Sequence, residues 1–241
     1  AFWAPSRGDA QRLEGAVSGD LGLTWRHFSL EALGNFIVSS LDVAADGEGR
    51  VFLALSGKDL ATPGAKQDIR LIRSADRGET WQVSRPRPES VAQGFRGRNP
   101  SLEIGPAPGQ VLLVWEDWRH LRGQLFLSLS QDGGGSWAID NLALPQPAGI
   151  NRTLTDALSA VYVQDQSYHV LAQQPVDDSL GAYHLYDVGF SLADLQQLAD
   201  SDRQTTNGAP NVTAAPGTSD QVTAPVGTAD EGQPISEPAE P

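Results

Sequence analysis

The residues best suited to chemistry form one short run, Glu116-Asp117-Trp118-Arg119-His120. The run combines two carboxylates, an aromatic platform, a guanidinium and an imidazole that can titrate near neutral pH. We therefore take four of its members as ligand-binding candidates: Glu116, Asp117, Trp118 and Arg119. A structural salt bridge between Asp117 and Arg119 is the alternative, and we favour it because charge pairs are common and seldom functional.

A second group of candidates consists of arginines in a chain that is otherwise acidic. Residues 85–99 hold four of them: Arg85, Arg87, Arg96 and Arg98. The planar guanidinium suits a carboxylate, so this segment could receive an anionic group. We take Arg96, Arg98 and the later Arg152 as ligand-binding candidates. The alternative, which we favour, is a solvated loop whose arginines pair with nearby acids.

No other set of residues indicates a catalytic or metal centre. The chain lacks cysteine, which excludes a disulfide framework and a thiolate metal site. It also lacks a zinc-type histidine cluster, a glycine-rich phosphate loop and a nucleophile-elbow motif. We expect no cofactor and no metal, and we assign no catalytic residue.

The composition excludes further classes of function. The chain has 241 residues and a net charge of −13, which argues against nucleic acid as a partner because phosphate binding needs a basic face. No apolar run approaches the roughly 18 residues of a membrane span. Without an initiator methionine or a signal peptide, we interpret the sequence as a processed or excised segment.

The elements that must position these residues are organised around a repeated motif, Ser-x-Asp-x-Gly-x-Thr/Ser-Trp. Its copies start at residues 18, 74 and 130, which is 56 residues apart both times. A fixed period of this size indicates a repeat architecture. A fourth stretch, 185–192, keeps only Asp-x-Gly-x-Ser, and we interpret it as a decayed copy.

The motif has the chemistry of a turn. Asp and Ser side chains bond nearby backbone amides, Gly tolerates a positive φ, and Trp anchors the next strand. We expect structural roles for twelve residues and similar, largely buried environments for the three tryptophans. The twelve are Ser18, Asp20, Gly22, Trp25, Ser74, Asp76, Gly78, Trp81, Ser130, Asp132, Gly134 and Trp137.

With five fixed positions recurring three times, the motif resembles the Asp boxes, or bacterial neuraminidase repeats, of sialidase-like β-propellers. The resemblance covers roughly residues 1–192. It implies an all-β propeller of four-stranded antiparallel blades, in which each box is a turn away from the active site.

The pattern of apolar runs places about three and a half blades, at residues 1–30, 36–84, 100–144 and 154–199. The first begins at its second strand, and the fourth ends in a short helix that starts at Ser191. A propeller must close a ring of about four to eight blades. We therefore expect missing N-terminal blades or a partner chain to complete it.

Residues 200–241 differ from the rest, because they are rich in Thr, Pro and acidic residues and contain no aromatic residue. Such a segment cannot bury enough apolar surface to offset its ordering entropy, so we predict a disordered linker or stalk. Tails of this kind are typical of extracellular or cell-surface proteins, which is the location we expect.

The order of the strands predicts at which end of the sheets a ligand would bind. Successive connections of an antiparallel meander alternate between its two ends, so the motif turns share an end with the connections between strands one and two. The opposite end carries the candidate residues, and in sialidase-like enzymes that end holds the ligand.

The sequence is compatible with two functions. Sialidases bind the substrate carboxylate with three arginines, and the resemblance implies that Arg98 and Arg152 could be two of them. However, the Phe/Tyr-Arg-Ile-Pro segment of that family is absent, and no Tyr–Glu nucleophile pair can be placed. We favour a secreted or surface-displayed propeller that binds glycan or protein. The alternative is the C-terminal part of an exo-glycosidase that hydrolyses terminal sialic acid or a related sugar.

Overall fold

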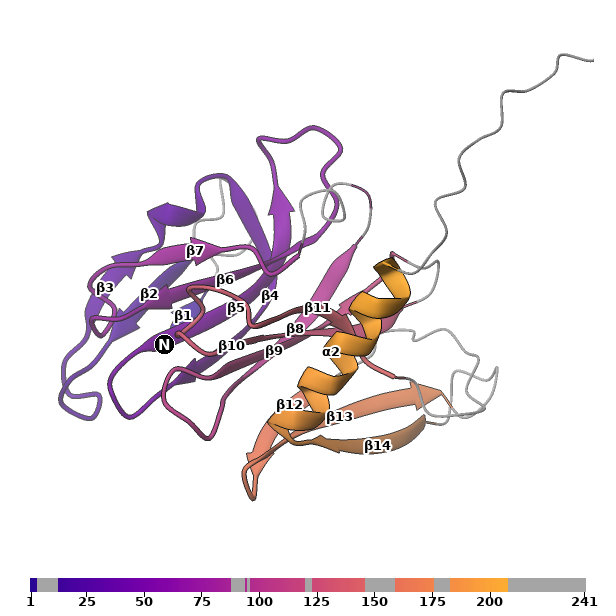
Figure 1. The fold of residues 1–241 in the computed structure, drawn as a ribbon. Helices are drawn as coiled ribbons and strands as arrows, with labels where there is room; N and C mark the ends of the chain where they lie inside the picture. The colour runs from indigo at the N-terminus through magenta and orange to yellow at the C-terminus, as the bar shows by residue number, and fades with distance from the viewer. Residues whose placement is uncertain are drawn as a thin grey trace, which may run out of the picture. The chain divides into compact units, whose positions relative to one another are not determined.

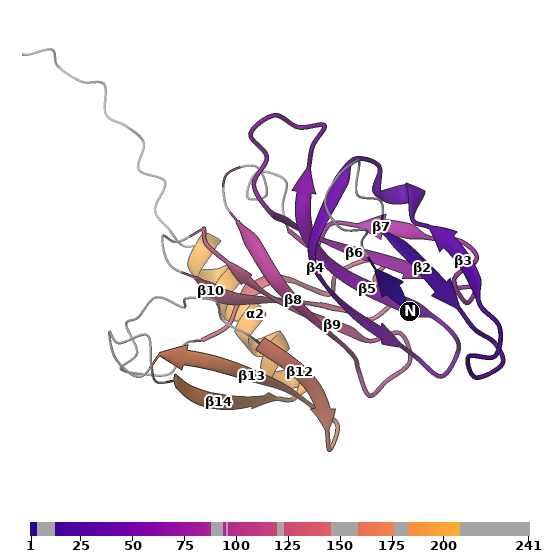
Figure 2. The same ribbon diagram turned by 180° about the vertical axis from the view of Figure 1, so that it is seen from behind.

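The computed structural model describes residues 1–3, 13–87, 94, 96–119, 123–145, 159–175 and 183–207. These residues form four antiparallel sheets that follow one another along the chain (Figures 1 and 2). Strands that are consecutive in sequence are neighbours in every sheet. This is the predicted all-β meander, with four strands in each of the two middle sheets.

The strands agree closely with the predicted runs. The first sheet contains β1 (Phe2–Trp3), β2 (Glu14–Val17) and β3 (Arg26–Ser29). After a short 3-10 helix, η1 (Glu31–Leu33), the second contains β4 (Phe36–Ala45), β5 (Val51–Asp59), β6 (Asp68–Ser74) and β7 (Gln82–Ser84). The third contains β8 (Gly97–Ile104), β9 (Val111–Asp117), β10 (Gln124–Ser130) and β11 (Ile139–Ala143). The fourth contains β12 (Ser159–Gln164), β13 (Ser167–Pro175) and β14 (Tyr183–Phe190), and α2 (Leu192–Asn207) follows it.

The core lies between successive sheets, and this explains why the middle strands are apolar at almost every position. In β5, Phe52 and Ala54 belong to the cluster shared with the third sheet, whereas Leu53 and Leu55 belong to the cluster shared with the first. Side chains of a strand alternate between its two faces, so a strand covered on both faces needs an unbroken apolar run.

Each copy of the repeated motif makes the same hydrogen bonds within its own segment. In the second copy, Ser74 Oγ accepts from the Gly78 N–H and donates to Asp76 Oδ1, both at 2.7 Å. Asp76 accepts from the Thr80 N–H at 2.8 Å and from the Thr80 hydroxyl at 2.5 Å. The equivalent distances in the other two copies lie between 2.6 and 2.9 Å. We call these three segments the motif turns.

Backbone geometry explains the glycine of the motif. The φ angles of Gly22, Gly78 and Gly134 are 90°, 86° and 77°, a region that other residues rarely adopt. A side chain at Gly134 would also collide, because its Cβ would lie 2.6 Å from Leu71 of the second sheet. Both observations support the structural role predicted for the motif.

The motif turns lie beside the connections between strands one and two of their sheets, as the order of the strands predicts. In the third sheet, the Gly133 N–H donates to the carbonyl of Gly109, in the β8–β9 turn, at 2.7 Å. In the second sheet, a Cβ built on Gly49 of the β4–β5 turn would lie 3.0 Å from Arg77. The candidate residues therefore lie at the opposite end.

Hydrogen bonds also join the first strands of successive sheets. Asp42 on β4 accepts from the backbone N–H of Leu102 on β8 at 2.8 Å. One residue earlier on β8, Ser101 Oγ accepts from the backbone N–H of Val161 on β12 at 3.2 Å. We call these contacts the inner-strand links.

The predicted burial of the three motif tryptophans is wrong for Trp25, which is 49% exposed. Trp81 stacks on Phe28 of the first sheet with ring centroids 5.5 Å apart. Trp137 is partly buried against the cluster between the second and third sheets. These two tryptophans pack against the preceding sheet, and within the described residues no sheet precedes the one that carries Trp25.

The decayed fourth motif does not form a turn, because β14 continues through it to Phe190. Leu185 stands where the other copies have the serine that holds the turn together, and that explains the difference. Asp187 instead accepts from the Tyr162 hydroxyl at 2.7 Å, and it lies 3.2 Å from Nδ1 of His169. All three side chains come from the fourth sheet.

The helix predicted after β14 is present, and it is longer than expected. Ser191 caps it, since its N–H donates to Asp194 Oδ2 at 2.8 Å and its Oγ accepts from the Asp194 N–H at 3.2 Å. Leu195 and Ala199, one turn apart, are buried between the third and fourth sheets. Because the helix continues to Asn207, the prediction of disorder from residue 200 is wrong for its first eight residues, and 208–241 lie outside the described residues. No helix in the described part is long and apolar enough to cross a membrane.

Candidate functional site

Six of the seven ligand-binding candidates meet at one end of the third sheet. Pairing of β8 with β9 sets Arg98 opposite Glu116 and Gly97 opposite Asp117. The pairing extends one step further, since the Trp118 N–H donates to the carbonyl of Arg96 at 3.0 Å. The seventh candidate, Arg152, lies outside the described residues.

Glu116 is completely buried and accepts hydrogen bonds from three side chains. Arg98 Nη2 donates to its Oε1 at 3.0 Å, Trp118 Nε1 donates to the same oxygen at 2.7 Å, and Asn99 Nδ2 donates to Oε2 at 3.1 Å. Arg98 also lies over the ring of Trp118, 5.4 Å from its centroid. The carboxylate is thus neutralised and fixes the positions of both Arg98 and Trp118.

Asp117 is equally buried and is held by two arginines. Its Oδ2 accepts from Arg87 Nε at 2.8 Å, from Arg119 Nη2 at 2.7 Å and from Trp115 Nε1 at 3.1 Å. Burial alone would raise the pKa of Asp117, but the hydrogen bond from Arg119 and the charge of Arg87 outweigh it, so the pKa lies below its usual value. Asp117 is therefore a buried, ionised structural carboxylate.

The two arginines are themselves anchored. Arg119 Nη2 also donates to Asn141 Oδ1 at 2.7 Å, and its guanidinium lies 3.9 Å from the centroid of the Phe126 ring. The side chain of Arg87 is fully buried and contacts Asp68 at 3.2 Å. The salt bridge that we favoured between Asp117 and Arg119 is present, and Arg87 is a second partner that sequence reasoning did not assign.

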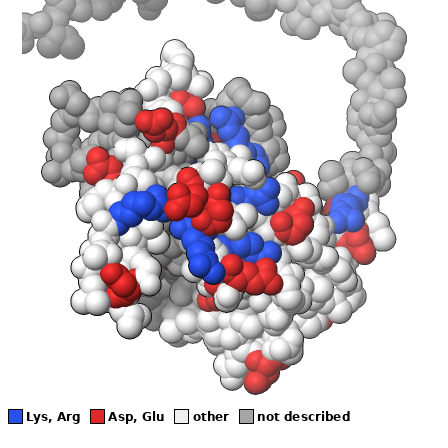
Figure 3. Space-filling view, turned by 90° about the vertical axis from the view of Figure 1, so that its left-hand side faces the viewer, with Lys and Arg blue, Asp and Glu red and all other residues white. Residues whose placement is uncertain are grey.

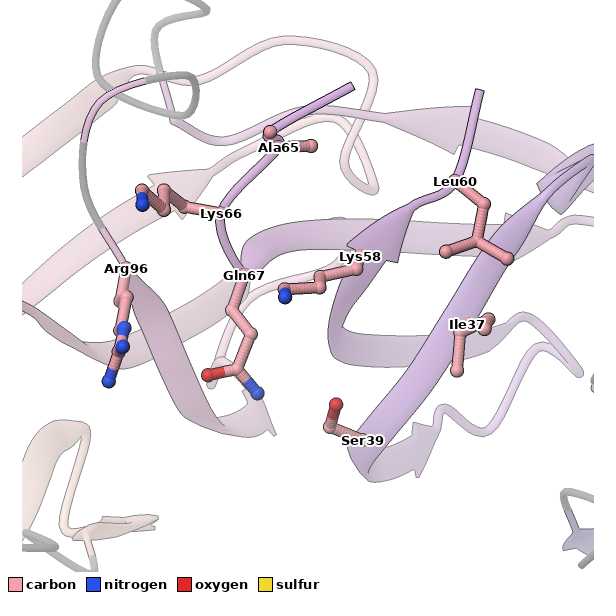
Figure 4. A pocket seen from close by; sticks show the side chains of 9 residues that line it. Ile37, Ser39, Lys58, Leu60, Ala65, Lys66, Gln67 and Arg96 are labelled. Carbon is pink, nitrogen blue, oxygen red and sulfur yellow. The ribbon is translucent and has the colours of Figure 1, made fainter. Parts of the chain in front are cut away.

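An open pocket of about 550 Å³ lies at the same end of the second sheet. Arg96, which is exposed, reaches it from the start of β8, and the other walls come from β4, β5 and the β5–β6 connection (Figure 4). Its lining residues are mostly polar or small: Ile37, Ser39, Lys58, Leu60, Gly64, Ala65, Lys66, Gln67 and Arg96. Of these, sequence reasoning selected only Arg96.

Charges elsewhere on the surface are mixed. The face seen in Figure 3 carries acidic and basic side chains next to one another, without a continuous patch of either sign. Arg26 and Glu79, for example, form an exposed ion pair at 2.8 Å. Within the described residues, no group of three or more His, Cys, Asp or Glu side chains could hold a metal ion.

Comparison with known proteins adds evidence on the fold. The sequence matches no protein-family model and no curated protein. Among solved structures, it is similar to the α-L-arabinanase of Penicillium chrysogenum, with a TM-score of 0.51 and 16% identity, over 77% of this chain and 55% of that chain. The chain has the β-propeller fold of such glycosidases. It spans about half the length of the arabinanase.

Two sialidases are also similar to the chain. That of Trypanosoma rangeli matches with a TM-score of 0.46 and 16% identity, over 86% of this chain and 31% of that chain. The NanB sialidase of Streptococcus pneumoniae matches with a TM-score of 0.45 and 18% identity, over 80% and 29%. At these identities the likeness concerns the fold, and the chemistry must be argued from this chain's own residues.

Proposed function

We propose that the chain is part of a sialidase-like Asp-box propeller, secreted or surface-displayed, that binds a glycan without hydrolysing it. One observation carries the proposal. At the end of the sheets that holds the candidate residues, which we call the candidate end, the carboxylates of Glu116 and Asp117 are paired with arginines beside an open polar pocket. Most glycosidases act through two carboxyl groups that touch the scissile bond, and sialidases, which use a tyrosine as nucleophile, still need accessible acidic side chains. Glu116 and Asp117 are fully buried and cannot do so without breaking their ion pairs.

The shape of the site favours a saccharide over a flat protein partner. A pocket of about 550 Å³ falls within the roughly 300–1,000 Å³ range of small-ligand sites. Ser39 and Gln67 supply a hydroxyl and an amide to the pocket, and such groups match the hydroxyls of a sugar. Trp118 is partly exposed on the neighbouring sheet and offers an aromatic surface.

A glycan array followed by calorimetry tests the proposal, with Gln67→Ala as the pocket variant. Gln131→Ala is the matched control, since Gln131 is an exposed glutamine in the third motif turn, at the other end of the sheets. We expect the wild type and the control to bind the same glycan and the pocket variant to bind it several-fold more weakly. Absence of binding to any glycan would overturn the proposal. Release of a sugar from the bound glycan would instead support the exo-glycosidase.

A further inference from the structure

The cations of the pocket at the candidate end are unusual for this chain. Lys58 and Lys66 are its only lysines, and both line the same pocket as Arg96. All three residues are exposed. Within the described residues, none of the three side chains makes an ion pair, although the chain carries a net charge of −13.

The acids closest in sequence to these lysines are already neutralised. Asp59 accepts from Arg70 Nη2 at 2.8 Å, and Asp68 contacts Arg87 at 3.2 Å. The positive charge of Arg85 also acts on both carboxylates. The pocket cations are therefore not cancelled by these acids, and the pocket is a local positive region on an acidic protein.

Figure 4 shows how the polar groups are disposed. The ends of Lys58 and Arg96 lie on either side of the Gln67 side chain, Lys66 extends toward the Arg96 side, and the Ser39 hydroxyl points toward the same space. Three cations from separate segments, with neutral donors between them, can surround one group that carries several oxygens. Lysine ammonium groups act as point charges that suit a phosphate or sulfate. A lone carboxylate, by contrast, can be bound by the two parallel N–H donors of a single arginine.

We propose that this pocket binds a tetrahedral oxyanion, a sulfate or phosphate ester, carried by a saccharide. The inference rests on the proposed glycan binding and adds the class of glycan. Lys58, Lys66 and Arg96 contribute the charge, and Gln67 and Ser39 donate the neutral hydrogen bonds. The open side of the pocket leaves room for the sugar that carries the ester.

The test is calorimetry or an NMR titration at low and moderate salt with six small ligands. They are galactose 6-sulfate, glucose 6-phosphate, glucuronate, uncharged galactose, inorganic sulfate and inorganic phosphate. We expect at least one of the two esters to bind about tenfold or more tightly than galactose and glucuronate. Binding should weaken as salt is added, because part of the attraction is screened. The free ions should bind more weakly than the ester because they lack the sugar contacts.

Variants then assign the site. Lys58→Gln, Lys66→Gln and Arg96→Gln should each weaken ester binding about tenfold, whereas Arg26→Gln, which changes an exposed cation on β3, should not. Because the three pocket side chains are exposed, the melting temperatures should stay near that of the wild type.

Several results would overturn the inference, and they separate it from the proposed function. Equal binding of esters and uncharged sugars leaves glycan binding intact and removes the oxyanion site. Inorganic sulfate or phosphate binding as tightly as the esters shows an anion site without a saccharide. Binding of esters that survives all three substitutions places the site elsewhere. If none of the six ligands binds, the oxyanion site is excluded, and the glycan array alone decides on glycan binding.

Discussion

At the motif-turn end of the sheets, Asp20, Asp76 and Asp132 accept hydrogen bonds from neutral groups that lie within four residues of them. At the candidate end, Asp117 accepts from Arg87, 30 residues earlier in the chain. Asp76 and Asp132 are exposed and Asp20 is partly exposed, whereas Asp117 is completely buried. One fold thus holds its carboxylates in two ways.

The comparison shows what each arrangement contributes. All the hydrogen-bonding groups of a motif turn lie in one short segment of the chain, so the three copies have the same geometry. A buried carboxylate needs charged partners to remain ionised, and for Asp117 one of them, Arg87, comes from a segment 30 residues away. The side-chain hydrogen bonds within the motif turns therefore stabilise single hairpins, whereas Arg87, which contacts Asp68 of the second sheet and Asp117 of the third, joins one sheet to the next.

The largest effect should come from removing the buried carboxylate. Asp117→Ala leaves Arg87 and Arg119 without their shared acceptor inside the protein. We expect a loss of about 3–5 kcal/mol in the free energy of unfolding, measured by urea denaturation. Glu79→Ala, which breaks an exposed ion pair, is the control and should change it little. A loss below about 1 kcal/mol for Asp117→Ala would show that the candidate end does not depend on this pair.

A smaller loss in the free energy of unfolding should result from changing a motif turn, and its size should differ between two copies of the turn. Ser130→Ala removes the acceptor of the buried Gly134 N–H, which should cost about 1–3 kcal/mol. Ser18→Ala removes the equivalent acceptor in the first copy, where Gly22 is exposed and can bond to water, so the loss should be smaller. Urea denaturation of both variants measures the difference. Equal losses would contradict the idea that burial, rather than the motif alone, sets the stability of each turn.

The smallest effect concerns pH at an exposed motif turn. The pKa of Asp76 is lowered to about 2 from 3.8, chiefly by the hydrogen bond from the Thr80 hydroxyl. A folded-state pKa below the unfolded one gives a stabilisation that is complete above about pH 4 and is lost as the pH falls through about 2. An NMR titration should find that midpoint, and Thr80→Val should move it upward. A midpoint near 3.8 in the wild type would show that the turn does not hold the ionised form.

Most of the fold could be predicted because its signals are local. The motif, the runs of apolar residues and the Ser191–Asp194 cap each lie within a few residues, and each is present. The fourth motif failed because Leu185 replaces the serine that closes the turn. The disorder prediction failed at residues 200–207 because it was based on the composition of the whole tail, whereas a helix already anchored by Leu195 and Ala199 can extend into it.

The candidate site was less predictable because its partners are distant in sequence. The pair of Asp117 with Arg119 could be foreseen from their separation of two residues, but the bond from Arg87 could not. Lys58, near the end of β5, and Lys66, in the β5–β6 connection, were missed because neither belongs to a motif. Their rarity was the available signal, since both lysines of an acidic chain fall within nine residues.

The inner-strand links have a consequence for how the protein unfolds. Through Asp42 and Ser101, a side chain of one sheet satisfies a backbone N–H of the next, so a sheet that opens leaves its neighbour with an unpaired donor. In repeat proteins, stability is the sum of the intrinsic terms of the units and the coupling between neighbours. The second, third and fourth sheets are coupled in this way. These three sheets should therefore exchange their amide hydrogens as one cooperative block. The first sheet is joined to the second by side-chain packing and an exposed ion pair, so it should open before that block.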